Sequence, residues 1–248
     1  MAIVDNQSKS VINLQEKGTF SKESGLLADR AYSYIRTLLA DGALGPGSRL
    51  NELEISQHLG ISRGPVREAI RRLTSSGLAI YEPNAGARVV SLDIDDVAQL
   101  YEVREALESR AAGLAAQHMT DEERATLIAT LDEHEARMTE AVSTSYPRGG
   151  SDWDFHLLIL KGARNAVIWR ICGDELRDMF SLLRNQHGSS PGRGYQALKE
   201  HRWIAEAIVA GHADFASLLM AQHIRASRDN LLSAIRTNAN KNNRLKSR

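Results

Sequence analysis

The sequence has a single cysteine, no long apolar run and no net charge. Cys172 alone cannot form an internal disulfide, and one thiol excludes zinc or redox sites of the CxxC type. No apolar run approaches the ~20 residues that a helix needs to span a bilayer, so we expect no membrane segment. The N-terminus lacks a basic start followed by an apolar core, so no secretory signal is expected. These absences favour a cytoplasmic protein.

Basic and acidic residues are equal in number, at 31 each, yet the charge is unevenly distributed. The last thirteen residues, 236–248, hold five basic side chains and no acidic one. Because nucleic-acid footprints are local, the neutral total does not exclude a nucleic-acid partner. With 42% hydrophobic residues, the chain can also bury real cores.

Composition and periodicity divide the chain into segments. Residues 1–22 are polar without a clear period and are expected to form a flexible arm. Residues 23–91 contain three short helical patterns and then two short strands around residues 83–86, which have turn chemistry. Residues 92–238 show only helical patterns, and residues 239–248 form a basic tail. The sequence predicts a mainly α protein, with an N-terminal winged helix-turn-helix followed by an all-helical bundle.

The second domain shows helical periodicity with identifiable helix starts. Thr120 and Glu123 have the spacing of a capping box, and a loop is expected at residues 143–150. The expected helices cover roughly residues 93–119, 121–142, 151–161, 165–187, 194–210 and 213–237.

The third helix of the first domain carries a stripe of arginines. Arg63, Arg67 and Arg71 are spaced four residues apart and share one face. A recognition helix enters the major groove by its N-terminal end, and arginine pairs two-pronged with guanine. Ser62 at the helix start is placed to contact a phosphate. The alternative is a solvated face, but Glu68 is the only acid nearby in the sequence and a wing follows, so DNA binding is favoured.

Residues 45–90, GPGSRLNELEISQHLGISRGPVREAIRRLTSSGLAIYEPNAGARVV, closely resemble the DNA-binding domain of GntR-family bacterial transcription regulators. The LNE start, the GISRGPVREAIRRL core, the closing GL and the PNxG wing all stand in order. The resemblance implies that Ser62, Arg63 and Arg67 contact the operator and that Gly86, at the wing tip, approaches the minor groove.

Two further positions bear on operator recognition. Arg88, on the hairpin, is expected to follow the groove beside the recognition helix. Leu53 stands where many members carry a base-reading arginine, so the operator sequence does not follow from the resemblance. Two protomers are expected to pair as a homodimer, so that both recognition helices meet successive half-sites of a palindromic double-stranded DNA operator.

Three histidines and one aspartate of the second domain have the character of metal ligands. Asp152 and His156 are four residues apart on one apolar helix, and His201 and His223 occupy comparable inward positions on separate helices. Imidazoles and a carboxylate suit a divalent transition metal, with room left for an effector's carboxylate. The alternative for each histidine is a hydrogen-bonded core residue. The other histidines fall at helix ends, loops or polar faces: His58, His118, His134, His187 and His212.

Residues 93–237 resemble the all-helical FCD effector domain of the FadR-like branch of the GntR family. The marks are VREALE near the start, a D-x-x-F-H segment, an E-H pair and the A-x-H-I of the last helix. In many members an aspartate and three histidines bind a divalent metal. The resemblance therefore implies that Asp152, His156, His201 and His223 bind zinc, nickel, manganese or iron.

The resemblance also implies that Arg104, in VREALE, faces an effector cavity, where a guanidinium can clamp a carboxylate. Its alternative is a salt bridge with Glu108, one turn later. Asn165 is either a second hydrogen-bonding residue of the cavity or a helix N-cap. A metal and a cationic side chain together indicate a small organic acid as effector, such as a sugar acid, a hydroxy acid or a dicarboxylate.

These features favour a metabolite-responsive transcription regulator, and a repressor in particular. The alternative is a metal-dependent hydrolase or lyase in which the metal activates a water. That reaction needs a general base, and Glu200 is expected to face away from His201. No nucleophile motif, phosphate loop or dinucleotide fingerprint is present, so no enzymatic activity is expected. A purely structural metal is compatible with the same residues.

Overall fold

A computed structural model of the chain describes residues 25–82, 84–140, 151–187 and 192–246. The expected arm and the expected loop at 143–150 lie outside these ranges. The chain divides into a winged unit, Met1–Leu39 with Ala43–Val90, and a helical unit, Ala40–Gly42 with Ser91–Arg248. None of the described helices has the length and apolar character needed to cross a membrane.

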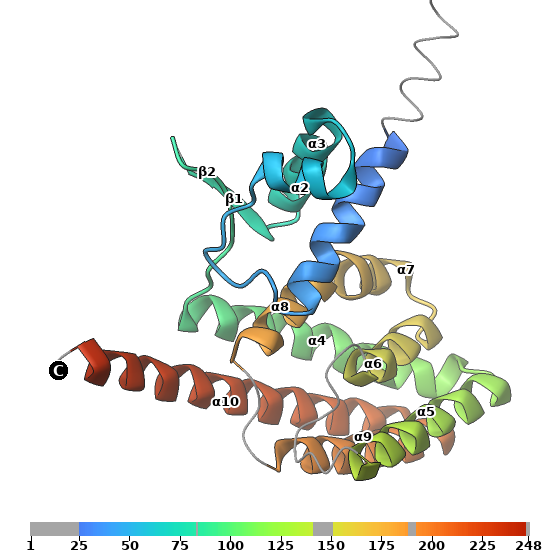
Figure 1. Ribbon diagram of the computed structural model, residues 1–248. Coiled ribbons are helices and arrows are strands. Elements are labelled where there is room, and N and C mark those ends of the chain that lie inside the picture. Colours follow the sequence, from blue (N-terminus) through green and yellow to red (C-terminus); the bar gives the residue numbers. More distant parts are fainter. Residues whose placement is uncertain (1–24, 83, 141–150, 188–191, 247–248) are drawn as a thin grey trace, which may run out of the picture. The chain divides into compact units, whose positions relative to one another are not determined.

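The winged unit contains three helices and a two-stranded hairpin, as predicted (Figure 1). A helix over residues 25–40 is followed by α2 (Glu52–Leu59) and α3 (Arg63–Ser75). Strands β1 (Ala79–Glu82) and β2 (Gly86–Val89) then pair antiparallel. Most of the side chains buried between these elements are apolar, among them Ala31, Ile35, Leu39, Leu50, Ile55, Val66, Ile70, Leu73 and Leu78.

Local capping places α3 beside α2. The Asn51 side chain accepts hydrogen bonds from the backbone N–H groups of Leu53 and Glu54, which fixes the start of α2. Gly60 ends α2 in the left-handed region, at φ 65°, where glycine is favoured. Ser62 occupies the N-cap position of α3 only two residues later. This tight turn leaves the N-terminus of α3 projecting from the unit.

Every element of the helical unit within the described ranges is a helix. The helices are α4 (Ile94–His118), α5 (Asp121–Glu140), α6 (Ser151–Gly162), α7 (Ala166–Ile168), the π-helix η1 (Trp169–Glu175), α8 (Arg177–His187), α9 (Arg193–Val209) and α10 (Ala213–Lys246). The fold class is therefore confirmed.

The single helix expected over residues 165–187 is wrong, because a π-helical segment divides it. The indole of Trp169 lies over Gly173, where a Cβ would come within 3.1 Å of the ring. In this segment backbone N–H groups bond to carbonyls five residues earlier, as Leu176 N–H does to Ile171 O at 2.9 Å. Hydrophobic periodicity does not distinguish such a local widening from an ordinary helix.

The expected end of the last helix at residue 237 is also wrong. Helix α10 continues to Lys246. The sequence after Gly211 contains neither glycine nor proline, the two residues that most strongly oppose a helix. Polarity alone therefore did not mark a helix end.

Helices α4 and α10 make the most extensive contact in the helical unit. They run antiparallel, since Gly113 of α4 lies against Ala213 and Ser217 while Glu105 pairs with Arg225. A Cβ at Gly113 would lie 2.4 Å from Ser217 Oγ and 3.1 Å from Ala213 O. The close approach of the two helices thus depends on the missing side chain.

Replacing Gly113 with valine is expected to destabilise the helical unit by about 1–3 kcal/mol, because the added methyl groups force the two helices apart. Urea unfolding followed by circular dichroism measures this change. Glu102→Val, which places the same side chain at an exposed position of α4, is the matched control. Equal stability of the two variants would contradict the close packing.

Candidate functional site

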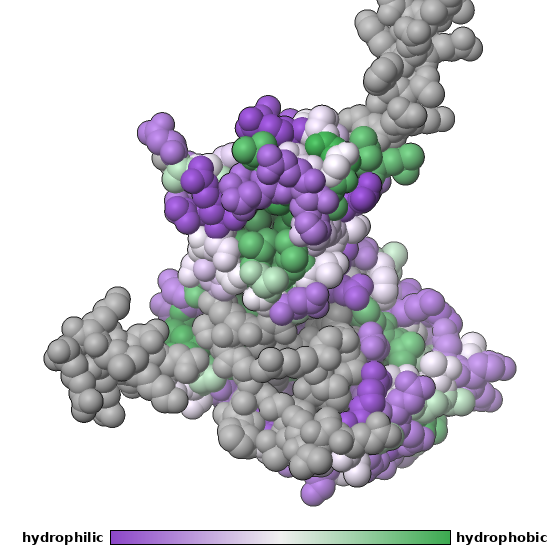
Figure 2. All heavy atoms as spheres, in the orientation of Figure 1, coloured by the Kyte–Doolittle hydropathy of each residue, from purple (hydrophilic) through white to green (hydrophobic). Residues whose placement is uncertain are grey.

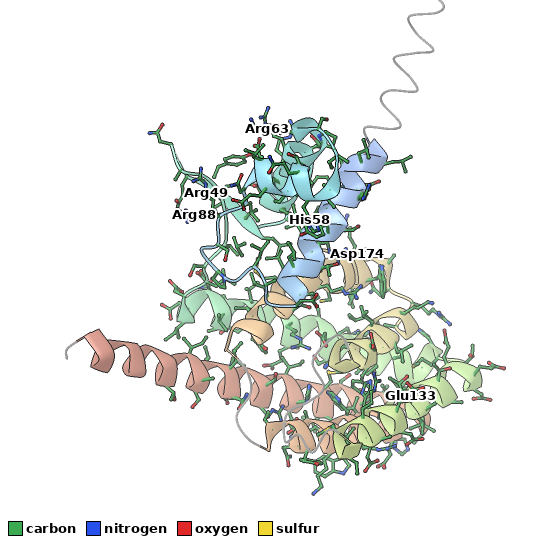
Figure 3. All side chains as sticks on the ribbon, in the orientation of Figure 1. Arg49, His58, Arg63, Arg88, Glu133 and Asp174 are labelled. Carbon is green, nitrogen blue, oxygen red and sulfur yellow. The ribbon has the colours of Figure 1, made fainter. Side chains whose placement is uncertain are left out.

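The arginine stripe predicted on α3 is exposed on one face of the helix. The side chains of Arg63, Arg67 and Arg71 are 59%, 58% and 70% exposed. Ser62 is exposed at the N-cap, and its side chain makes no capping hydrogen bond, so its hydroxyl is available to a ligand. Figure 3 shows Arg63 projecting outward at the start of the helix. Helix α3 therefore presents an N-terminal end suited to the major groove.

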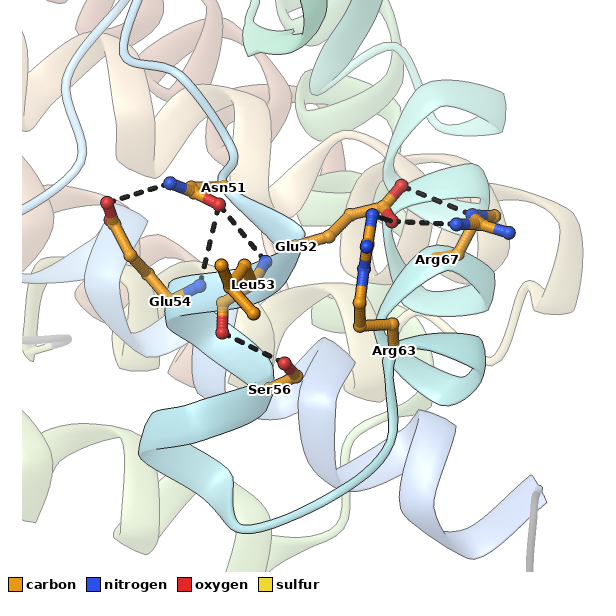
Figure 4. Close-up of polar contacts among 7 residues, drawn as sticks. All are labelled: Asn51, Glu52, Leu53, Glu54, Ser56, Arg63 and Arg67. Atoms are coloured by element: carbon orange, nitrogen blue, oxygen red, sulfur yellow. Dashed lines mark hydrogen bonds and ion pairs between the residues drawn. The ribbon is translucent and has the colours of Figure 1, made fainter.

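The expectation that Glu68 is the only acid near this stripe is wrong. Glu52, at the start of α2, accepts hydrogen bonds from Arg63 at 3.3 Å and from Arg67 at 3.0 Å (Figure 4). The hydrogen bond from Arg67 holds the pKa of Glu52 below its ordinary value. Glu68 pairs with Arg71 instead. Glu52 was missed because it precedes Arg63 by 11 residues and approaches from another helix.

The wing adds two basic residues beside the hairpin. Arg88 donates to Glu82 at 2.7 Å and to the carbonyl of Gly47 at 3.0 Å, which fixes its side chain on the strand. Arg49, which the sequence analysis did not single out, forms a β-bridge with Arg88, is exposed, and lies beside it in Figure 3. Gly86 stands at the start of β2 with φ 85°. In Figure 2, hydrophilic residues gather over this part of the unit. Such a surface can neutralise phosphates.

The helical unit brings together three of the four predicted metal ligands. His156 of α6, His201 of α9 and His223 of α10 are all buried, and their candidate ligand atoms lie within 4.8 Å of one another. The Nε2 atoms of His201 and His223 are 3.2 Å apart. Asp152 belongs to α6, one turn before His156, but its side chain lies outside the described residues.

Two glutamates orient His156 and His223, two of the three histidines of this cluster. Glu108 accepts a hydrogen bond from His156 Nδ1 at 2.5 Å, and Glu200 accepts one from His223 Nδ1 at 2.7 Å. A neutral histidine that donates through Nδ1 carries its lone pair on Nε2, as a metal ligand requires. Glu200, expected to face away from His201, therefore reaches the cluster through His223. Its partner is on α10, which spacing along α9 could not show.

Each glutamate is held in turn by an arginine. Arg104 donates from Nε to Glu108 at 2.6 Å, and Arg193 donates from Nη1 to Glu200 at 2.8 Å. Burial by itself would raise the pKa of both carboxyls. The charges and hydrogen bonds of their arginine and histidine partners instead lower the pKa of Glu108 and of Glu200 to about 2. Two Arg–Glu–His chains thus converge on the cluster with their carboxylates ionised.

The alternative interpretation of Arg104, a salt bridge with Glu108, is present in the structure. The Arg104 side chain is 5% exposed, and its Cζ atom lies 5.1 Å from the Phe180 ring centroid and 5.6 Å from that of Tyr101. These contacts fix Arg104 close to His156, through Glu108. A role in binding an effector stays a prediction.

Asn165 has the N-cap role that was one of its two expected roles. The Asn165 side chain accepts from the backbone N–H groups of Val167 and Ile168, both at 3.1 Å, and so caps α7. Its use as an effector ligand stays a prediction.

His134, expected on a polar face, is wholly buried in α5, because that face packs toward the interior of the unit.

Each of the two units matches a known protein family. Residues 27–89 match the family described as "Bacterial regulatory proteins, gntR family", and residues 99–226 match the FCD domain. The chain belongs to the GntR family. The FCD match alone covers more than half of its length.

Several relatives are similar in sequence to most of this chain. A "Probable D-xylose utilization operon transcriptional repressor" of Paenarthrobacter nicotinovorans is 30% identical over 209 residues, covering 81% of this chain and 86% of the relative. A "Putative L-lactate dehydrogenase operon regulatory protein" of Escherichia coli K12 is 27% identical over 229 residues, covering 80% and 83%. The chain is thus similar to bacterial transcription regulators over both units.

Solved structures of GntR-family proteins share the fold. A putative transcriptional regulator from Rhodococcus sp. RHA1 superimposes with a TM-score of 0.69 at 24% identity, over 84% of this chain and 98% of the other. E. coli McbR/YncC gives a TM-score of 0.70 at 20% identity, over 84% and 97%.

Removing one arginine from the α3 stripe is expected to weaken DNA binding. Arg67→Ala should cost about 1–3 kcal/mol on a duplex selected from random sequences, because arginine supplies paired donors to base edges. Fluorescence anisotropy at fixed salt measures the loss. Arg110→Ala, at an exposed site of α4, removes the same charge from the helical unit and should change little.

Removing the charge of Glu200 is expected to weaken metal binding without abolishing the fold. Glu200→Gln should lower affinity for zinc about 10- to 100-fold, the usual effect of losing an outer carboxylate that orients a histidine. Competition with a chromophoric chelator gives the affinity. Glu206→Gln, on the exposed face of α9, is the control, and equal affinities would show that Glu200 does not support the cluster.

Proposed function

We propose that the chain is a metabolite-responsive repressor that binds a palindromic operator as a homodimer and releases it when a small organic acid binds at a metal site in the helical unit. The observation that carries this proposal is the buried histidine cluster with its two Arg–Glu pairs, in a chain that also has a winged helix-turn-helix unit. Such a regulator acts in the cytoplasm, where its operator is.

The winged unit supports the DNA-binding half of the proposal. The N-cap and the exposed face of α3 supply Ser62, Arg63, Arg67 and Arg71, and the wing supplies Gly86 and Arg88. Base edges in the major groove would be read by the arginines of α3, and phosphates would be held by Ser62 and by the wing. A second protomer would place the same surface on the next half-site.

The chemistry of the histidine cluster fits a divalent transition metal. Three imidazoles, whose candidate ligand atoms lie within 4.8 Å of one another, would supply part of the coordination shell of such an ion. Asp152 would add an oxygen ligand. Zinc, nickel, manganese and iron all accept such a set, and positions left open would be filled by water or by an effector's oxygen atoms.

An organic acid suits this site because a metal and a nearby guanidinium both attract carboxylates. Arg104 is linked to His156 of the cluster through Glu108, to which both residues are hydrogen-bonded. One relative is named for an L-lactate dehydrogenase operon, and lactate is a hydroxy acid, which agrees with this class of effector. The effector can release DNA only to the extent that it prefers the non-binding arrangement.

A metal-dependent hydrolase or lyase is less well supported. Its general base would need a pKa near the working pH, whereas the pKa of Glu108 and that of Glu200 are lowered to about 2 by their bound partners. These carboxylates are therefore weak bases. A purely structural metal uses the same ligands and differs only in making no contact with an effector.

Metal analysis combined with thermal unfolding tests the proposal. The purified wild type is expected to hold about one ion per chain, and sugar acids, hydroxy acids or dicarboxylates at about a hundred times their Kd should raise the melting temperature by ~5–10 °C. His156→Ala should lose both the ion and this rise. His212→Ala, an exposed histidine between α9 and α10, should keep both.

Other outcomes separate the alternatives. A bound ion with no response to any carboxylate indicates a structural metal. Absence of metal with an unchanged ligand response in His156→Ala would make the histidines core residues. Turnover of an added acid would overturn the regulator in favour of the enzyme.

A further inference from the structure

Glu52 is an acid placed in the middle of a basic surface. Its carboxylate meets Arg63 Nη2 at 3.3 Å and Arg67 Nε and Nη2 at 3.3 and 3.0 Å, so one side chain of α2 bridges two arginines of α3 (Figure 4). Because the arginines are four residues apart on a helix, they point the same way and share this partner.

These contacts contribute little to folding stability. Both arginine side chains are more than half exposed, and exposed ion pairs are screened by water and salt. An acid at this position also opposes the attraction of the surface for phosphates, on which binding to any duplex depends. The effect of Glu52 is therefore on how the two arginines meet DNA.

We propose that Glu52 determines operator specificity: it holds Arg67 and Arg63 in the orientation that reads bases and weakens their attraction to the phosphates of other DNA. This inference rests on the proposed function in DNA binding. Glu52 is a positioning residue, which acts through the arginines.

The geometry of Arg67 shows how this works. Nε and one hydrogen of Nη2 face the carboxylate, which fixes the plane of the guanidinium. Nη1 and the second hydrogen of Nη2 remain on the other edge, and two such donors match the O6 and N7 acceptors of guanine. Because the guanidinium is already oriented, less side-chain freedom is lost when it meets a base.

The same contact acts against non-specific binding. To reach phosphates at an arbitrary position, Arg63 and Arg67 must leave Glu52, whose charge then lies unpaired near the DNA backbone. At the operator, the arginines can read bases while keeping the carboxylate. Glu52 thus penalises non-specific binding more than operator binding.

The test uses the full-length protein and duplexes selected from a random-sequence pool. Dissociation constants for the selected duplex and for a scrambled duplex are measured at one salt concentration for wild type, Glu52→Gln and Glu54→Gln. Glu54 is the matched control, since it lies in the same turn of α2 but bonds to Asn51 at 2.7 Å. Melting temperatures check that each variant folds.

Glu52→Gln is expected to bind the scrambled duplex more tightly. The ratio of the dissociation constant for the scrambled duplex to that for the selected duplex should fall about tenfold, within the ~5- to 150-fold discrimination that one two-pronged arginine supplies. Glu54→Gln should tighten both equally and keep the ratio. If the ratio for Glu52→Gln matches that for Glu54→Gln, the role of Glu52 is overturned. If the wild type enriches no sequence at all, the proposed DNA-binding function itself fails.

Discussion

The helical unit depends on the burial of ionisable groups at its centre. Moving charges or imidazoles out of water is costly unless each is hydrogen-bonded or paired. Glu108 is 1% exposed and would be unstable as a lone anion, but Arg104 and His156 bind its two oxygens. Glu200 is compensated in the same way by Arg193 and His223. The surrounding helices must therefore meet at positions that keep all these bonds.

This requirement explains the arrangement of the bundle. Helix α4 supplies Glu108, while α6, α9 and α10 supply one histidine each. Helices α9 and α10 form an antiparallel pair around the turn at Gly211, which brings His201 and His223 to the same level. Four helices thus contribute to one polar centre, and the close approach of α4 to α10 at Gly113 is a separate packing contact of the same unit.

Local patterns predicted much of this structure, and long-range contacts account for what they missed. The arginine stripe, the hairpin and the inward histidines all follow from spacing within one element. Glu52 and Glu200 acquire their roles from partners on other helices, which spacing within an element cannot show. The π-helical segment was missed for a different reason, because hydrophobic periodicity does not separate its widened turns from those of an ordinary helix.

Arginine–glutamate pairs recur in both units, and their solvent exposure decides what each pair can do. Breaking a buried pair such as Arg104–Glu108 leaves an uncompensated charge at a cost of about 3–5 kcal/mol, so that pair stays formed and fixes its histidine. Breaking an exposed pair such as Arg67–Glu52 costs little, since water solvates both groups. In the proposed mode of binding, Arg67 keeps Glu52 while it reads operator bases and leaves it only to reach a phosphate of other DNA. The same two residue types therefore provide a rigid support in one unit and an exchangeable contact in the other.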